Sequence, residues 1–411
     1  MPDGTLLAGC DDASRLIPPE AALGRLLAQT RQLGVTEACA AQASAGRVLA
    51  ADVTAPRCLP PFHHAAMDGF ALTAADLAIA HPPRVLRRIT AGDPPGAALL
   101  PGEAARVLTG AALPAGAAAV VMEEHARVVD GRLWLRRKPE PGQNIRRAGE
   151  DVAEGAAVLA AGRRVVARDV ALLAALGIAT VQVRARPRVG VLSNGNELAG
   201  GLVHDSNRPM LLALLRGADV ELVDLGLLPD DPRHIAAALR AAAAGTDLIL
   251  TTGGLSGSDA DHLPAALLAA GGTVEVLRLA QKPGKPLAHG QLGAARCLLL
   301  PGNPVAALVG MLTLGLPLLA RLAGAEACAL PPQPVRLARD LHRTPGRVEF
   351  RPARRVGLDA SGLPLVEPLG RGGSASLSPL VEADGLVRLP AEAARFEAGE
   401  RLGFLPFPEG C

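Results

Sequence analysis

From Pro187 to about residue 322 the chain alternates short apolar runs with helix-like segments, and this alternation limits the possible fold more than any other feature. The expected strands are Arg188–Leu192, Val220–Leu225, Asp247–Leu250, Val274–Leu279 and Arg296–Leu300. The expected helices are Arg208–Arg216, Pro232–Ala244, Asp259–Ala270 and Pro304–Leu322. Strands that alternate with helices favour a mostly parallel sheet covered on both faces, so we expect a three-layer α/β/α unit.

One of these strands runs directly into a glycine-rich loop. Asp247–Leu250 is followed by two glycines, then by hydroxyl residues, Asp259 and Asp261. Glycine lets the backbone approach an anion closely, and a helix starting near Asp259 would add its positive N-terminal end. Carboxylates beside an anion site require a cation between them. The loop therefore predicts a phosphorylated ligand handled together with a divalent metal.

Two further loops follow strands of the same predicted sheet, Ser193–Glu197 and Pro301–Pro304. Because ligands bind outside the carboxyl ends of parallel strands, we expect the three loops to converge on one site. Gln281–Pro286 holds two lysines between prolines, which favours an anion grip over an ordinary solvated loop. The helix expected after Pro301 has free N–H groups at its start that also suit an anion.

The rest of the chain suggests further domains, as expected for 411 residues. Residues 18–34 resemble an amphipathic helix with Gly34 as C-cap, and Val165–Leu176 resembles a second helix closed by Gly177; we expect the two to pack together. Short β-like runs fill the region between them and the region after Pro332. The predicted domains are a discontinuous, elongated helical/linker domain (1–52 and 151–184), a β-rich insert (53–150), the α/β domain (185–327) and a C-terminal β domain (328–411).

Composition excludes several classes of function. Forty-two Lys and Arg against 40 Asp and Glu give a net charge of +2, which argues against nucleic acid as a partner. The six cysteines form no C-x-x-C pair, so neither a disulfide framework nor a zinc site is expected. No signal-peptide pattern opens the chain, which predicts a cytoplasmic protein. Cys297–Ala320 carries no charge, but prolines break it, so we expect a strand, a loop and a buried helix and no contact with membrane.

Three polar segments remain open to more than one interpretation. In Pro60–Phe70, Asp68-Gly69 is an ordinary turn on its own, and the adjacent His63 and His64 would point to opposite faces of a strand. Gly142–Asp151 is either an arginine clamp for phosphate or pterin, or a charged linker. In Val203–Arg208, a serine or asparagine could serve as N-cap of the helix that follows.

Taken together, these segments resemble the family of MoeA-type molybdopterin molybdenumtransferases, which includes the E domain of gephyrin-like proteins. The matching motifs are A-M-D-G-[YF], G-x-N-I-R-x-x-G-E-D, D-S-N-R, T-x-G-G-x-S-x-x-D-x-D, K-P-G-K-P and P-G-N-P, in family order between residues 60 and 304. The resemblance implies an enzyme of molybdenum cofactor biosynthesis with four domains, the last of them β-barrel-like. Its substrates would be molybdate and adenylylated molybdopterin, and Mg²⁺-dependent insertion would release AMP.

The resemblance also implies partners and site residues. It implies a homodimer whose cleft lies between the α/β domain of one subunit and the β insert of the other, and contacts with molybdopterin adenylyltransferase and downstream molybdoenzymes. The implied catalytic residues are Asp68, Asp151, Glu197, Asp261, Lys282 and Lys285, of which Asp68, Glu197 and Asp261 would also bind the metal. The implied ligand-binding residues are Thr109, Arg146, Asp230, Gly253, Gly254, Ser256, Arg278, Pro301, Gly302, Asn303 and Ser378, and Ser374 matches the same serine-bearing loop as Ser378.

The chain departs from the family pattern at residues 193–198, which read S-N-G-N-E-L where the family usually has S-T-G-D-E-L. Asn196 thus replaces an acid, and an amide can coordinate a metal but supplies no charge. Two alternatives to the insertase remain. One, which Asn196 supports, is a catalytically impaired paralogue that acts as a molybdopterin-binding or scaffold protein. The other is the adenylyltransferase that makes adenylylated molybdopterin, which uses the same type of α/β domain but against which the extra β domains argue.

Overall fold

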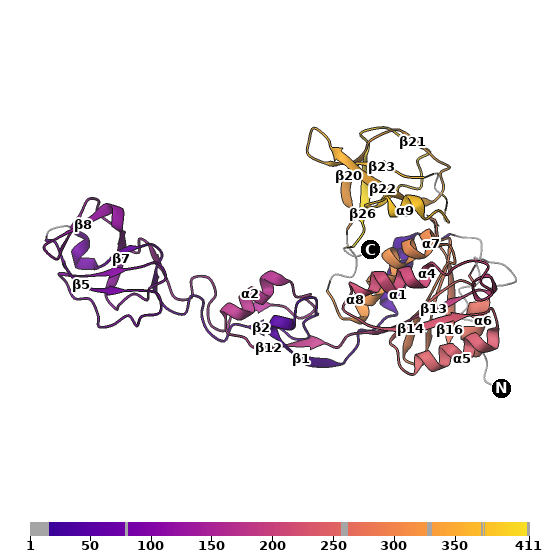
Figure 1. Cartoon of the computed structure of the whole chain (residues 1–411), viewed down its shortest axis with the longest axis horizontal. Helices are drawn as coiled ribbons and strands as arrows, with labels where there is room; N and C mark the ends of the chain where they lie inside the picture. Colours follow the sequence, from indigo (N-terminus) through magenta and orange to yellow (C-terminus); the bar gives the residue numbers. More distant parts are fainter. Residues whose placement is uncertain are drawn as a thin grey trace.

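The computed structural model describes residues 16–78, 81–255, 262–326, 331–370, 373 and 375–408. The molecule is elongated, with the β insert at one end and the α/β and C-terminal units at the other (Figure 1). A narrow middle segment joins the two ends, and the chain passes through it once on the way to the insert and once on the way back. The insert is therefore held away from the α/β unit of its own chain.

The α/β unit contains one six-stranded sheet in the order β14-β13-β15-β19-β18-β16. The first four of these strands are parallel, whereas β18 is antiparallel to both neighbours. All five predicted strands are confirmed, but the sequence does not predict β18, because proline, histidine and glycine interrupt its apolar pattern. The bounds are β13 Arg188–Asn194, β14 Glu221–Leu228, β15 Leu248–Thr252, β16 Thr273–Arg278, β18 Pro286–Leu292 and β19 Ala295–Leu300.

Helices cover both faces of this sheet, which confirms the three-layer prediction (Figure 1). One apolar core lies under α1, α4 and the long helix α7-η4-α8, and a second lies under α5 and α6 on the opposite face. The start predicted for α6 at Asp259 lies outside the described residues. The bounds are α1 Pro19–Ala28, α3 Asn196–Ala199, α4 Asn207–Arg216, α5 Pro232–Ala243, α6 His262–Ala269, α7 Pro304–Gly310, η4 Met311–Gly315 and α8 Leu316–Leu322.

The prediction for the first helix is wrong in two respects. The helix ends at Ala28, before Gly34, because the backbone N–H of Leu33 donates to Leu322 O and draws the chain along the end of α8. Its buried residues Ala22 and Leu26 belong to the α/β core, so α1 does not pack against the helix at 165–176. Apolar residues alone do not say which neighbour a helix will contact.

The long apolar helix changes to π geometry between Met311 and Gly315. Pro317 explains the change, because proline has no N–H and its ring crowds the carbonyl four residues earlier. In the described part of the chain, this Pro304–Leu322 helix alone is long and apolar enough to span a bilayer, and 72% of that apolar window is buried inside the fold. The predicted order of strand, loop and buried helix is confirmed.

The middle segment is made of two-stranded ladders and one helix. β1 pairs with β12 and β2 pairs with β11, in each case joining the outgoing and returning chain. Helix α2 ends before Gly177, which has a φ of +72°. The bounds are β1 Thr36–Ala40, η1 Ala41–Ala43, β2 Val53–Thr54, β11 Ala157–Leu159, α2 Ala167–Ala175 and β12 Thr180–Arg184. The domain boundaries themselves stay predictions.

The insert is a six-stranded sheet in the order β7-β4-β6-β5-β9-β8, and β3 and β10 form a small ladder at its base. The β-like runs that the sequence predicts here, Arg106–Leu108, Ala119–Met122 and Leu133–Leu135, overlap β6, β7 and β9. The bounds are β3 His64–Ala65, β4 Gly69–Thr73, η2 Ala74–Ala78, β5 Arg84–Ile89, β6 Glu103–Val107, β7 Ala117–Met122, η3 Glu123–His125, β8 Ala126–Val129, β9 Arg132–Leu135 and β10 Ile145–Arg146.

The C-terminal unit is a closed β-barrel, because its strands pair in the order β22-β23-β20-β26-β24 and β24 pairs again with β22. The short strand β17, from the lysine loop of the α/β unit, pairs in parallel with β22. Val305 and Val309 of α7 pack against Val348 and Phe350 of the barrel. The bounds are β17 Gln281–Lys282, β20 Gln333–Leu337, β21 Leu341–His342, β22 Val348–Leu358, β23 Pro364–Pro368, α9 Ser378–Val381, β24 Gly385–Leu389, β25 Arg395–Phe396 and β26 Arg401–Pro406.

Candidate active site

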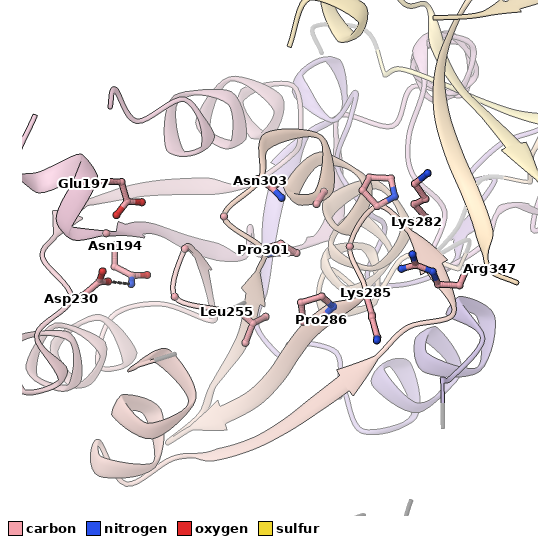
Figure 2. A pocket seen from close by; sticks show the side chains of 17 residues that line it. Asn194, Glu197, Asp230, Leu255, Lys282, Lys285, Pro286, Pro301, Asn303 and Arg347 are labelled. Atoms are coloured by element: carbon pink, nitrogen blue, oxygen red, sulfur yellow. Dashed lines mark hydrogen bonds between the residues drawn. The ribbon is translucent and has the colours of Figure 1, made fainter. Parts of the chain in front are cut away.

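A cavity of about 670 Å³ lies at the carboxyl ends of the parallel strands, where the α/β unit meets the barrel (Figure 2). Loops after β13, β14, β15 and β19 converge there, as the topology requires. The lysine loop and one residue from the barrel complete the wall. The lining residues are Asn194, Gly195, Glu197, Asp230, Gly253, Gly254, Leu255, Lys282, Pro283, Gly284, Lys285, Pro286, Pro301, Gly302, Asn303, Ala306 and Arg347.

Two loops at one end of the cavity are joined through Asp230. The side-chain amide of Asn194 donates to Asp230 Oδ1 at 2.6 Å, as drawn in Figure 2, and the backbone N–H of Asn196 donates to Asp230 Oδ2 at 3.0 Å. In return, Asn196 Oδ1 accepts from the backbone N–H of Asp230 at 3.0 Å. The side chain of Asn196 is therefore engaged with the neighbouring loop and does not line the cavity.

Glu197 presents an open carboxylate to the cavity. A Cβ on Gly195 would lie 2.7 Å from Glu197 Oε1, so glycine at this position leaves room for the carboxylate. Within the described part of the chain, this carboxylate has no ion-pair or hydrogen-bond partner. Oxygen ligands of this kind suit a hard cation such as Mg²⁺. No cluster of three or more His, Cys, Asp or Glu residues that could hold a metal occurs among the described residues.

The two glycines after β15 are explained by close backbone approach. Gly253 has a φ of +104°, and a Cβ there would lie 2.1 Å from the carbonyl oxygen of Asn194. On Gly254 the Cβ would lie 2.7 Å from Asn194 Nδ2. The glycines thus allow the loop to lie directly on the β13 loop. The predicted site residues Ser256 and Asp261 lie outside the described residues.

The opposite wall of the cavity is cationic. Lys282 and Lys285 come from the lysine loop, and Arg347 comes from the residue before β22 of the barrel. Lys282 Nζ lies 3.8 Å from the buried Glu349 Oε1, and Arg347 donates to Gln281 O at 3.3 Å. The barrel therefore both supports the lysine loop and supplies a third cation.

Sequence reasoning does not identify Arg347 or Asn194 as lining residues. Arg347 follows a Pro-Gly turn in a region punctuated by many such turns, so nothing local distinguishes it. Asn194 lies inside the predicted loop Ser193–Glu197, next to Gly195, but the motif does not single it out. Gly195, Leu255, Pro283, Gly284 and Pro286 also lie in loops predicted for the site, whereas Ala306 lies outside them.

Four predicted site residues lie in or beside the insert, at the other end of the molecule (Figure 1). Asp68 Oδ1 accepts hydrogen bonds from the hydroxyl and the backbone N–H of Thr109, both at 2.7 Å, and these bonds lower the pKa of Asp68. Arg146 forms an ion pair with Glu150, while Asp151 is exposed near the start of the middle segment. Within one chain these residues do not join the cavity.

Two further predicted residues lie apart from the cavity lining. Arg278 ends β16 with its carbonyl bonded to Ile17 N, and Ser378 is the exposed first residue of α9. Ser374 lies outside the described residues.

His63 accepts a hydrogen bond from Ala148 N through its Nδ1, and His64 lies in β3. Among the described residues, most of the site residues predicted in the α/β domain therefore line one cavity, whereas those predicted in the insert lie away from it.

Three family models match consecutive parts of the chain. They are the MoeA N-terminal region (domain I and II) at residues 17–177, the probable molybdopterin binding domain at 190–321, and the MoeA C-terminal region (domain IV) at 334–407. A molybdopterin molybdenumtransferase of Haemophilus influenzae is 36% identical over 90% of this chain and 94% of its own. Molybdopterin molybdenumtransferase 2 of Mycobacterium tuberculosis is 35% identical over 87% and 91%. The crystal structure of the molybdopterin biosynthesis MoeA protein from Pyrococcus horikoshii OT3 has a TM-score of 0.81 at 29% identity and covers 96% of this chain and 100% of its own.

Proposed function

The chain belongs to the molybdopterin molybdenumtransferase family and acts in molybdenum cofactor biosynthesis by molybdenum insertion, and from this premise we propose that the cavity binds adenylylated molybdopterin and molybdate. The convergence of four strand-end loops with three cationic side chains supports this assignment more than any other single observation. The impaired scaffold protein is not favoured, because the named relatives cover nearly the whole chain.

The cationic wall matches the charge of these substrates. Molybdate and a pyrophosphate link bring several negative charges, and Lys282, Lys285 and Arg347 would neutralise part of them. The backbones at Gly253 and Gly302 would lie against the phosphates, because both positions lack a side chain. Insertion forms bonds from the dithiolene sulfurs to molybdenum while a protonated molybdate oxygen leaves as water. Attack of water on the pyrophosphate link then breaks it, releasing AMP and leaving the other phosphate on the pterin. In this scheme the residues act by electrostatic positioning and provide no covalent nucleophile.

We propose Mg²⁺ as the divalent cation. Glu197 is the best-placed described ligand because its carboxylate is open to the cavity, and Asp261 and Asp68 would complete the set. Mg²⁺ usually keeps several waters and binds through one or two carboxylates plus substrate phosphates, so a full protein cage is not needed. When bound, it would offset the charge that develops on the phosphates. Asn196 is left out of this set, since its side-chain oxygen already accepts the Asp230 N–H.

A homodimer would bring the insert to the cavity. The insert, which carries Asp68, Thr109 and Arg146, lies at the far end of its own chain (Figure 1), so a second copy would place it beside Lys282. The two bonds from Thr109 keep the Asp68 carboxylate ionised and oriented, as a metal ligand requires. We further propose that the reaction takes place in the cytoplasm, with contacts to the adenylyltransferase that supplies the substrate and to the molybdoenzymes that receive the product.

The reaction itself tests the proposal. Purified protein is mixed with adenylylated molybdopterin, molybdate and Mg²⁺, and AMP is followed by chromatography. Molybdate-dependent AMP release that requires Lys282 and Glu197 supports the site assignment. Tight nucleotide binding without AMP release would instead support a scaffold protein, and full activity of a Lys282→Ala variant would remove this cavity as the site. Light scattering tests the dimer, and a monomer at micromolar concentration would contradict a shared cleft.

A further inference from the structure

Asn207, in the Val203–Arg208 segment, has a role that its sequence position does not suggest. The sequence favours a serine or asparagine here as the N-cap of the following helix, yet Ser206 occupies the cap position of α4 without any side-chain cap bond. Asn207 is only 7% exposed, and its side chain turns into the protein beneath the cavity. It does not line the cavity itself.

The amide group of Asn207 joins two loops of the cavity. Its Nδ2 donates to Thr252 Oγ1 and to the carbonyl oxygen of Gly302, each at 2.7 Å. Thr252 is the last residue of β15 and leads into Gly253, whereas Gly302 follows β19. The two amide hydrogens thus bridge the ends of neighbouring strands.

Thr252 extends the bridge. Its hydroxyl accepts from Asn207 and donates to Pro301 O at 3.1 Å, so the same loop is held at two successive carbonyls. The two loops also touch directly, since a Cβ on Gly302 would lie 3.6 Å from Gly253 Cα. The hydrogen bonds of Asn207 and Thr252 therefore set the distance between the backbones of Gly253 and Gly302, both of which line the cavity.

Stability alone does not account for an asparagine at this place. Among the described residues, Asn207 Oδ1 is buried without a hydrogen-bond partner, which opposes folding and which a leucine of similar size would avoid. Helix α4 is anchored independently, because Leu211 and Leu215 lie in the core and Arg208 forms ion pairs with Asp205 and Asp224. The bridge between the loops is what the amide contributes.

We propose that Asn207 is a positioning residue that fixes the separation of the Gly253 and Gly302 loops for the phosphate part of the substrate. The identity of that ligand rests on the proposed function, whereas the bridge rests on the hydrogen bonds. The class of residue matters, because neither a carboxylate nor an alkyl group can donate two hydrogens to a hydroxyl and a carbonyl.

The test compares Asn207→Leu with Ser206→Ala, its neighbour and matched control. AMP binding is measured by calorimetry and folding by thermal unfolding. Two lost hydrogen bonds predict AMP binding weaker by about 10-fold or more in Asn207→Leu, together with a lower Tm, because the carbonyl of Gly302 loses its donor. Ser206→Ala should match the wild type in both. Wild-type affinity in a folded Asn207→Leu variant would overturn the inference.

Thr252→Val provides a second approach if Asn207→Leu does not fold. It removes the hydroxyl that links Asn207 to Pro301 and leaves the asparagine in place, and it should also weaken AMP binding. In the double variant the two effects should not add, because both changes break one bridge. Fully additive effects, or wild-type affinity in Thr252→Val, would contradict the bridge.

Hydrogen exchange separates this inference from the proposed function. Peptides that cover residues 252–255 and 301–303 should exchange about 10-fold faster in Asn207→Leu than in Ser206→Ala, with or without ligand. If the wild type fails to bind AMP while these peptides behave as expected, the nucleotide assignment fails and the positioning role stands. Unchanged exchange in both variants refutes the positioning role itself.

Discussion

Gly253→Ala tests whether the cavity depends on two backbones lying in contact. Alanine would have to adopt a φ of +104°, and its Cβ would lie 2.1 Å from the carbonyl oxygen of Asn194. A strained φ of this kind costs about 1–3 kcal/mol, and forced repacking typically adds about 1–3 kcal/mol. We therefore expect Gly253→Ala to lose about 2–6 kcal/mol of unfolding free energy in the α/β unit.

Gly302→Ala is the matched control, because it also lines the cavity but its Cβ would meet its nearest neighbour, Gly253 Cα, at an ordinary 3.6 Å. Thermal unfolding should show a fall in Tm of about 5 °C or more for Gly253→Ala and about 2 °C or less for Gly302→Ala. Equal Tm values for the two variants would refute the close-contact argument.

Three further predictions concern charges around the proposed site. Asn196→Asp should leave Mg²⁺ affinity unchanged in calorimetry, because the new oxygen would still accept the Asp230 N–H; tighter binding would show that position 196 faces the cation. Thr109→Val should raise the pKa of Asp68 toward its ordinary value of 3.8. The hydrogen bonds from Thr109 lower the pKa of Asp68 in the folded protein, so their stabilisation is present above pH 3.8 and is lost as the pH falls through the lowered pKa. An NMR titration should therefore give a higher pKa for this carboxyl in Thr109→Val than in the wild type. Arg347→Ala should weaken molybdate binding by about 10-fold, measured by calorimetry at low salt, and an unchanged affinity would remove this residue from the anion wall.

Local chemistry explains why much of the α/β unit could be predicted. Apolar runs bounded by glycine or proline define β13, β15 and β19, and the parallel arrangement then places their following loops at one edge. Glycines at 253 and 254 indicate close backbone approach before any neighbour is known. The antiparallel strand β18 escapes the same reasoning, because its polar residues and Gly290 break the pattern that marks a buried strand.

The functional side chains that sequence reasoning missed or misassigned share one property. Each acts through a residue far along the chain: Asn207 through Gly302, Asn194 through Asp230, and Arg347 through Gln281. A motif records which residues occur, but the partner of a hydrogen bond depends on how distant loops are folded together. The same limit explains why the sequence predicts the wrong neighbour for α1, whose buried residues lie in the α/β core.

By itself, the sequence determined the layered α/β unit, the glycine and lysine loops of the site, and membership of the family. Hydrophobic periodicity, turn residues and the order of motifs can all be read from neighbouring positions in the chain. Only the tertiary structure decided which loops touch, that the barrel supplies Arg347, and that Asn196 bonds Asp230 in place of facing the cavity. It also placed the insert, which carries Asp68, at the far end of its own chain (Figure 1). These outcomes depend on long-range packing and on the direction of individual side chains, which no local pattern encodes.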